Sequence, residues 1–392
     1  MQWLPEDGLA GTLVGRAWVP GPIPGPAVIV LRADGVYDLS AVVATMSDLL
    51  DAADPVALVR AAPGRRVGDL DQLMLQHSGS QAPDASALRL LAPCDLQVIK
   101  AAGVTFAASL IERVIEEQAM GDAAQAAAVR QQVVELIGDN LGAIKPGSAQ
   151  ALQLKELLIQ KGLWSQYLEV GIGPDAEVFT KAPVLSSVGA GAQIGIHPGS
   201  AWNNPEPEIV LAVNSRGEVV GASLGNDVNL RDFEGRSALL LGKAKDNNAS
   251  CAIGPFIRLF DASFSLDDVR QCTVSLLVEG VDGFELRGSS SMAQISRDPL
   301  DLVAQTLGAH HQYPDGIMLV LGTMFAPTQD RGAPGSGFTH KLGDRVHISS
   351  PKLGRLVNEV NACDRIAPWT FGLRQFFANL SARGLLAGSG PF

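Results

Sequence analysis

The sequence predicts an α+β protein rich in β-strands, with a helical insertion and a small N-terminal unit. Glycine and proline are frequent, at 42 and 23 of 392 residues. Short Val/Ile/Leu runs lie between them, a pattern typical of strands and turns. One stretch, at about 107–168, instead repeats apolar residues at steps of three and four, which indicates helices. We therefore expect a main domain built mostly of strands and interrupted near its start by helices.

The predicted N-terminal unit covers residues 1–75. TLVGRAWV and AVIVLRADGVYDL have the composition of short strands, and Asp34-Gly35 is a hairpin turn signal. Residues 42–53 have helical spacing. A polar stretch of small residues follows, so we place a linker at 76–95.

The predicted main domain covers residues 96–392. Its insertion holds three helical patterns, SLIERVIEEQA, AAQAAAVRQQVVELI and SAQALQLKELLIQ, and Ser148 can cap the last one. From Glu169 onward strand patterns return, in GEVVGASL, TVSLLVEG, IMLVLGTM and DRVHISS. Residues 369–386 are expected to form a helix.

Composition excludes several classes of function. The 30 basic and 41 acidic residues give a net charge of −11, which argues against partners such as nucleic acid or an anionic membrane. The apolar stretch 317–326 is far short of the roughly 20 residues of a spanning helix. The first residues, MQWLPEDGLAG, lack the regions of a signal peptide. Four separated cysteines without a CxxC pair fit a reducing cytoplasm and no cysteine zinc site.

Residues 203–232 carry the most informative pattern. Strands at Ile209–Val213 and Glu218–Leu224 flank a turn, which predicts a hairpin. With a loop of two or four residues, Ser223 lies opposite Glu208. Because side chains alternate between faces, Asp227 then shares one face with Glu206 and Glu208. A three-residue loop or a bulge would break this parity.

Three carboxylates on one face repel each other unless a cation neutralises them or water solvates them. Oxygen ligands select a hard ion, so we expect Mg²⁺, with Mn²⁺ or Ca²⁺ as substitutes. The alternative is an outer face of ordinary exposed acids. The residues alone leave both interpretations open.

Other candidate groups are single residues. Lys245 could bind a substrate carboxylate, act as an acid or base, or form a Schiff base, but spacing does not separate it from Lys243. Thr323 follows an apolar strand, where a hydroxyl can orient a substrate oxygen or simply form a turn. Glu116 and Glu117, on a predicted helix, are expected to be solvated. No GxSxG, P-loop or GxGxxG motif supports a nucleotide cofactor.

Several motifs in order resemble the fumarylacetoacetate hydrolase family. They are PEPEIVL, LGNDVNLRD, KDNNASCAIGP, LGT and LGDRVHISSPKLGRLVNEV, with FTKAP and, more loosely, GVTFAASLIE. The resemblance covers most of 97–110 and 169–360. It implies a mixed β-sheet roll around a divalent metal.

By matching motif positions, the resemblance implies that Glu206, Glu208 and Asp227 bind Mg²⁺. It also implies functional roles for Lys245, Thr323 and Glu112, the last as an acid–base group. Ser109 stands where hydrolytic members carry the histidine that activates water. A serine cannot serve as that base at neutral pH.

The chain is most similar to the bacterial 2-keto-3-deoxy-pentonate dehydratases, through its helical insertion and segments such as WNNPEPE and DFEGRSALLLGKAKDNNASCAIGP. This implies loss of water from a 2-oxo sugar acid derived from xylonate or arabinonate, giving 2,5-dioxopentanoate, and a homodimer or higher homo-oligomer. Two alternatives are a metal-dependent acylpyruvate or diketo-acid hydrolase of the same family and an inactive oxo-acid-binding protein.

Overall fold

The computed structural model describes most of the chain. The described residues are 3–75, 86–120, 122, 125–126, 130, 144–160, 164–325, 327–332 and 337–386. No helix among them is long and apolar enough to cross a membrane.

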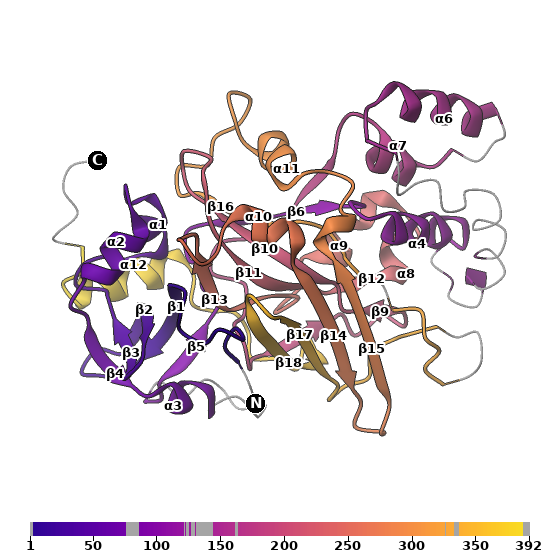
Figure 1. Cartoon of the computed structure of the whole chain (residues 1–392). Helices are drawn as coiled ribbons and strands as arrows, with labels where there is room; N and C mark the ends of the chain where they lie inside the picture. Colours follow the sequence, from indigo (N-terminus) through magenta and orange to yellow (C-terminus); the bar gives the residue numbers. More distant parts are fainter. Residues whose placement is uncertain are drawn as a thin grey trace.

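One large mixed sheet runs through the molecule (Figure 1). Its strands, in spatial order, are β4 (Arg65–Gly68), β3 (Gly35–Asp38), β2 (Gly25–Arg32), β1 (Leu13–Val19), β13 (Cys251–Leu259), β11 (Val219–Asp227), β10 (Pro207–Val213), β16 (Ile317–Val320), β6 (Val98–Gly103) and β7 (Glu177–Ala182), with β5 (Arg89–Leu91) paired to β1. The β16–β6 pair is parallel and its neighbours are antiparallel.

A five-stranded sheet packs against the large one. Its order is β15 (Glu285–Ser291), β14 (Thr273–Glu279), β17 (Arg345–Ser350), β18 (Gly354–Ala362) and β8 (Gln193–Ile196). Strand β14 alternates exposed and buried residues, so one face enters the core, where Leu276 joins the same apolar cluster as Leu211 and Leu224. A short pair, β9 (Asn203–Asn204) and β12 (Asn229–Leu230), extends the β10–β11 hairpin region.

Helices occupy the two ends of the large sheet and its margins (Figure 1). They are α1 (Met46–Asp51), α2 (Pro55–Ala61), α3 (Leu70–Leu75), α4 (Ala107–Gln118), α6 (Ala149–Gln160), α7 (Gln166–Ile172), α8 (Arg231–Glu234), η2 (Ala238–Leu240), α9 (Leu241–Lys245), α10 (Leu266–Gln271), η3 (Met292–Gln294), α11 (Pro299–Thr306) and α12 (Leu373–Ala382). Helices α4 and α7 share an apolar cluster that includes Leu110, Leu168 and Trp202. This cluster attaches the insertion beside the β10–β11 hairpin.

The predicted α+β, strand-rich class is confirmed. Two insertion helices appear as α4 and α6, and Ser148 caps α6 by accepting a hydrogen bond from the Ala151 amide at 3.2 Å. The pattern at 123–137 lies largely outside the described residues. The helix expected at 42–53 is shorter, because Thr45 accepts a hydrogen bond from the Asp48 amide and so starts α1 at Met46.

The N-terminal strands join the large sheet directly. Leu13 of β1 pairs with Arg258 of β13, and residues Arg16–Trp18, further along β1, pair with β5. Residues 76–85 of the predicted linker lie outside the described part of the chain. The division into 1–75, 76–95 and 96–392 therefore stays a prediction. The large sheet includes strands from both the predicted N-terminal unit and the predicted main domain.

Candidate metal centre

The β10–β11 hairpin brings the three predicted carboxylates together. Glu208 lies opposite Gly225, and the Asp227 amide donates to the Glu206 carbonyl at 3.1 Å. The predicted register, with Glu208 opposite Ser223, was wrong by two residues. The loop between Val213 and Val219 holds five residues, and an irregularity follows at the next position. An odd loop and a one-residue bulge each invert the faces, so together they preserve the predicted parity.

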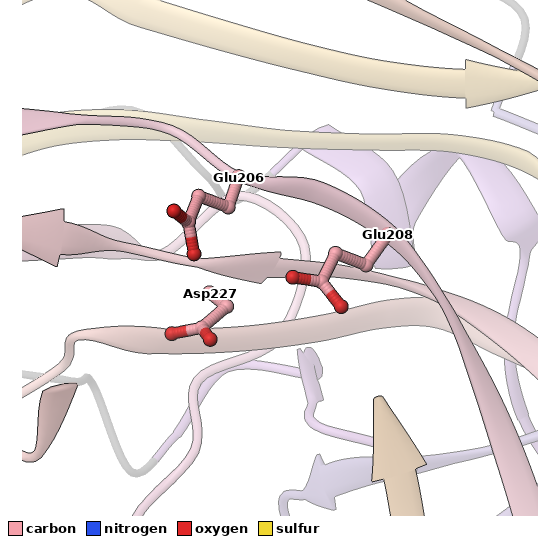
Figure 2. A group of neighbouring side chains, drawn as sticks. All are labelled: Glu206, Glu208 and Asp227. Atoms are coloured by element: carbon pink, nitrogen blue, oxygen red, sulfur yellow. The ribbon is translucent and has the colours of Figure 1, made fainter. Parts of the chain in front are cut away.

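Glu206, Glu208 and Asp227 point toward one another (Figure 2). Each offers an oxygen within 4.8 Å of the others, and their exposed fractions are 1%, 1% and 3%. The alternative of a solvated outer face is therefore wrong. Buried carboxylates this close need positive charge beside them.

Lysine side chains supply part of that charge. The Lys245 Nζ lies 2.5 Å from Glu206 Oε2 and 3.0 Å from Asp227 Oδ2. The Lys181 Nζ, fully buried, lies 2.8 Å from Asp227 Oδ1. Lys243 is exposed and lies over the Phe233 ring. The structure thus separates Lys245 from Lys243, because α9 turns only the former inward.

Glu208 has a different environment. The Gly322 amide donates to its Oε2 at 2.5 Å, and the Thr323 hydroxyl donates to its Oε1 at 3.3 Å. No basic side chain forms an ion pair with Glu208 within the described residues. Burial, together with Asp227 and Glu206, raises the pKa of Glu208 well above its usual value.

Glu206 shows the opposite behaviour. Burial raises its pKa, but the charges of Lys245 and Arg113 outweigh that effect and hold the pKa of Glu206 at about 2. The neighbouring carboxyls therefore differ in their need for a cation, and Glu208 is the one that lacks a basic partner.

The charge balance fits a divalent metal ion. Five carboxylates are buried in this region, Glu116, Glu206, Glu208, Asp227 and Glu234, against four cations, Arg113, Lys181, Arg231 and Lys245. Negative charge is thus in excess beside Glu208. Three convergent carboxylates are all-oxygen donors, which suit Mg²⁺, Mn²⁺ or Ca²⁺.

Helix α4 braces the cluster through an arginine that sequence reasoning missed. Arg113 forms ion pairs with Glu206, with Glu116 at 2.6 Å and with Glu234 at 3.0 Å. Arg231 lies 3.2 Å from Glu116 and donates to Asn204 at 2.8 Å. The prediction that Glu116 is solvated was wrong, because these two arginines enclose it and leave it 1% exposed.

The other predicted residue of this helix lies among arginines. Glu112 forms an ion pair with Arg130 at 2.6 Å and lies 3.9 Å from Arg231. Its role as an acid–base group stays a prediction. Ser109 donates its hydroxyl to the Phe106 carbonyl at 2.8 Å, a helix contact that gives it no proton-accepting role.

Glu177 is a second carboxylate that sequence reasoning missed. It begins β7 opposite Gly103, and a Cβ added at Gly103 would lie 1.8 Å from its Oε2. Burial raises the pKa of Glu177 to about 7, with Glu234 adding to the effect and Arg113 and Lys245 opposing it. Its position two residues before the FTKAP motif was the available signal. A carboxyl that titrates near neutrality suits proton transfer.

Comparison with known proteins agrees with the family resemblance of the sequence motifs. Residues 172–361 match the family described as Fumarylacetoacetate (FAA) hydrolase C-terminal. A probable 2-keto-3-deoxyxylonate dehydratase of Haloferax volcanii is 30% identical over 194 residues, 50% of this chain and 63% of that protein. A 2-dehydro-3-deoxy-D-arabinonate dehydratase of Saccharolobus solfataricus is 32% identical over 187 residues, 47% of this chain and 58% of that one. The chain thus matches about three-fifths of the length of these relatives.

Solved structures share the fold. The apo form of 2-keto-3-deoxy-D-arabinonate dehydratase has a TM-score of 0.58 at 19% identity and covers 90% of this chain and 99% of its own. The same enzyme with magnesium and 2,5-dioxopentanoate has a TM-score of 0.56 at 20% identity and the same coverage.

Proposed function

We propose that the protein is a Mg²⁺-dependent dehydratase of the fumarylacetoacetate hydrolase family, because residues 172–361 match that family. Its reaction removes water from a 2-keto-3-deoxy-pentonate and yields 2,5-dioxopentanoate. The observation that carries the proposal is the buried group of Glu206, Glu208 and Asp227. The names of the two curated relatives support the reaction class, and the names of the solved structures agree with it.

The three carboxylates would hold the metal ion. When bound, Mg²⁺ supplies a Lewis acid that can take both the carboxylate and the 2-oxo group of the substrate and acidify the hydrogens at C3. Lys245 and Thr323 flank the cluster and would bind the substrate carboxylate or the oxygen at C2, where negative charge develops.

Proton transfer falls to carboxylates beside the cluster. A base takes a proton from C3, the C4 hydroxyl leaves as water after receiving a proton, and the unsaturated product tautomerises to the C5 aldehyde. Glu112 is the candidate implied by the family resemblance. Glu177 is a second candidate, supported by its pKa of about 7 and its electrostatic interaction with Glu206 and Lys245.

The direct test is a substrate screen with product identification by mass spectrometry. We expect formation of 2,5-dioxopentanoate from one or more 2-keto-3-deoxy-pentonates with Mg²⁺, no product after EDTA treatment, and recovery with Mg²⁺ or Mn²⁺. Hexose-derived keto-deoxy acids serve as the comparison for chain length. Full turnover by metal-free protein would contradict the proposal.

The alternatives are separable in the same assays. An acylpyruvate or diketo-acid hydrolase would release acid from a diketo acid, but Ser109 is held by the Phe106 carbonyl and offers no base for water. A Schiff-base dehydratase would form a stable adduct at Lys245 with borohydride and substrate. An inactive oxo-acid-binding protein would show no turnover.

We also propose that the protein forms a homodimer or a higher homo-oligomer. Analytical ultracentrifugation measures the mass of the particle in solution and so tests this proposal.

A further inference from the structure

The outer face of the five-stranded sheet carries a hollow of about 410 Å³. Strands β14, β15, β17 and β18 form it; Figure 1 shows where these strands lie. Its polar lining consists of three serines, two arginines and one histidine, namely Ser275, Ser289, Ser349, Arg287, Arg355 and His347. No carboxylate is among its lining residues.

Strand register explains why the hollow forms here. Ser275 pairs with Ser289 on one side and Ser349 on the other, and Ser349 pairs with Arg355. These residues therefore form one row across four strands. Three small side chains in a row leave space above the sheet. In the next row, Leu277 of β14 lies between Arg287 and His347, which add a second wall.

Polar atoms in this hollow lack partners within the described residues. His347 is 4% exposed, and its Nε2 lies 2.7 Å from Glu279 Oε2 while its Nδ1 has no hydrogen-bond partner. The buried Nε of Arg355 also has none. Arg287, by contrast, pairs with Glu285 at 2.7 Å. Buried polar atoms without partners are rare and costly, so each calls for an unseen partner.

We propose that this hollow binds the phosphate group of a small phosphorylated metabolite. Arg355 and Arg287 present planar groups of donors that match phosphate oxygens, and the serine hydroxyls add neutral donors along the floor. A phosphate oxygen would accept a hydrogen bond from the free Nε of Arg355. This site is separate from the carboxylate cluster and does not depend on the proposed dehydratase reaction.

The test is a calorimetric titration of the EDTA-treated full chain with inorganic phosphate, at an ionic strength held constant with sodium chloride. Removing metal keeps phosphate from binding at the carboxylate cluster. We expect saturable binding in the millimolar range, and a loss of about tenfold or more in affinity for Arg355→Gln. Ser275→Phe, which fills the hollow from an exposed position, should abolish binding. It also keeps the test valid if Arg355→Gln fails to fold.

The matched control is Arg345→Gln, on the same face of β17 but outside the hollow. It should bind phosphate within about twofold of the unaltered chain, since it removes equal charge without removing a lining group. An equal loss in both arginine variants would show diffuse attraction and overturn the proposal. Absence of saturable binding, acetate binding as tight as phosphate, or a shift in oligomeric state for Ser275→Phe would also overturn it.

Discussion

At the scale of single residues, Glu208 is the carboxylate whose surroundings demand a cation. Within the described part of the chain, its two hydrogen-bond donors are a neutral amide and a neutral hydroxyl, whereas Glu206 and Asp227 each contact basic side chains. An ionised carboxylate buried without a charged partner is costly. A bound metal ion would therefore supply the positive charge that Glu208 needs in order to ionise at this position.

Glu208→Gln tests this account. The amide keeps the shape but removes the charge, so we expect Mg²⁺ affinity to fall by at least about 100-fold, the upper end of losses seen for outer-shell changes. The melting temperature of the metal-free protein should stay equal or rise, because a glutamine resembles the protonated Glu208 and cannot ionise beside Asp227 and Glu206. Calorimetric titration with Mg²⁺ and thermal unfolding give the two measurements. Glu218→Gln, exposed on the same hairpin, is the control and should change neither.

Glu177 should set the pH dependence of the reaction. Burial raises its pKa to about 7, and a base acts only when deprotonated, so kcat/KM should rise with pH through about 7 and then level. Glu177→Gln should lower kcat by about 10²–10⁴-fold and remove this rising limb, with Mg²⁺ affinity unchanged. If the loss appears in Glu112→Gln instead, Glu112 is the base. Glu169→Gln on α7, paired with Lys155, is the control.

Arg113 neutralises three carboxylates at once. Arg113→Met leaves Glu116, Glu206 and Glu234 buried without this cation, and breaking such a pair costs about 3–5 kcal/mol. We expect a correspondingly lower stability in urea unfolding of the metal-free protein. Adding Glu116→Gln should restore part of the loss, because it removes one uncompensated charge. If Arg113→Met alone is as stable as the unaltered chain, the ion-pair network around Arg113 contributes little to the stability of the protein.

At the scale of elements, hairpin β10–β11 shows what alternation can and cannot predict. The prediction that Glu206, Glu208 and Asp227 share one face of the hairpin was correct. Side chains alternate with a period of two, and the observed register differs from the predicted one by an even number of residues. The bulge after Val219 could not be predicted from the sequence, because nothing in a Val-rich strand marks where an extra residue is accommodated. The prediction for Glu116 was wrong for another reason. Helical spacing indicates which face of the helix Glu116 occupies, but it does not indicate that Arg231, from a distant segment, forms an ion pair with it.

The strand pair β6–β7 positions Glu177, and this leads to a prediction about Gly103. The carboxylate lies over the bare backbone of Gly103, where a methyl group would displace it. Gly103→Ala should therefore reduce kcat while leaving Mg²⁺ affinity within about twofold, since the side chain of Glu177 is flexible and can shift. Gly242→Ala, at an open position, is the control. Loss of Mg²⁺ binding in Gly103→Ala would show wider damage to the sheet.

At the scale of the whole molecule, the junction of β1 with β13 connects the N-terminal strands to the metal centre. Arg258 of β13, 1% exposed, donates to both carboxylate oxygens of Asp7, at 2.9 and 2.6 Å, and to the Lys352 carbonyl at 2.9 Å. Strand β13 pairs on its other side with β11, where Cys251 lies opposite Asp227. One strand thus contacts both the N-terminal strands and the hairpin that carries a proposed metal ligand.

This continuity predicts that the N-terminal strands and the metal centre unfold together. In hydrogen exchange at rising urea, peptides from β1 and β2 should lose protection at the same concentration as peptides from β10 and β11, since cooperative units share their opening free energy. Arg258→Met should shift both sets equally, by breaking the ion pair between the buried Arg258 guanidinium and Asp7. Earlier exchange of β1 and β2, with β10 and β11 still protected, would instead mark residues 1–75 as an independently unfolding domain.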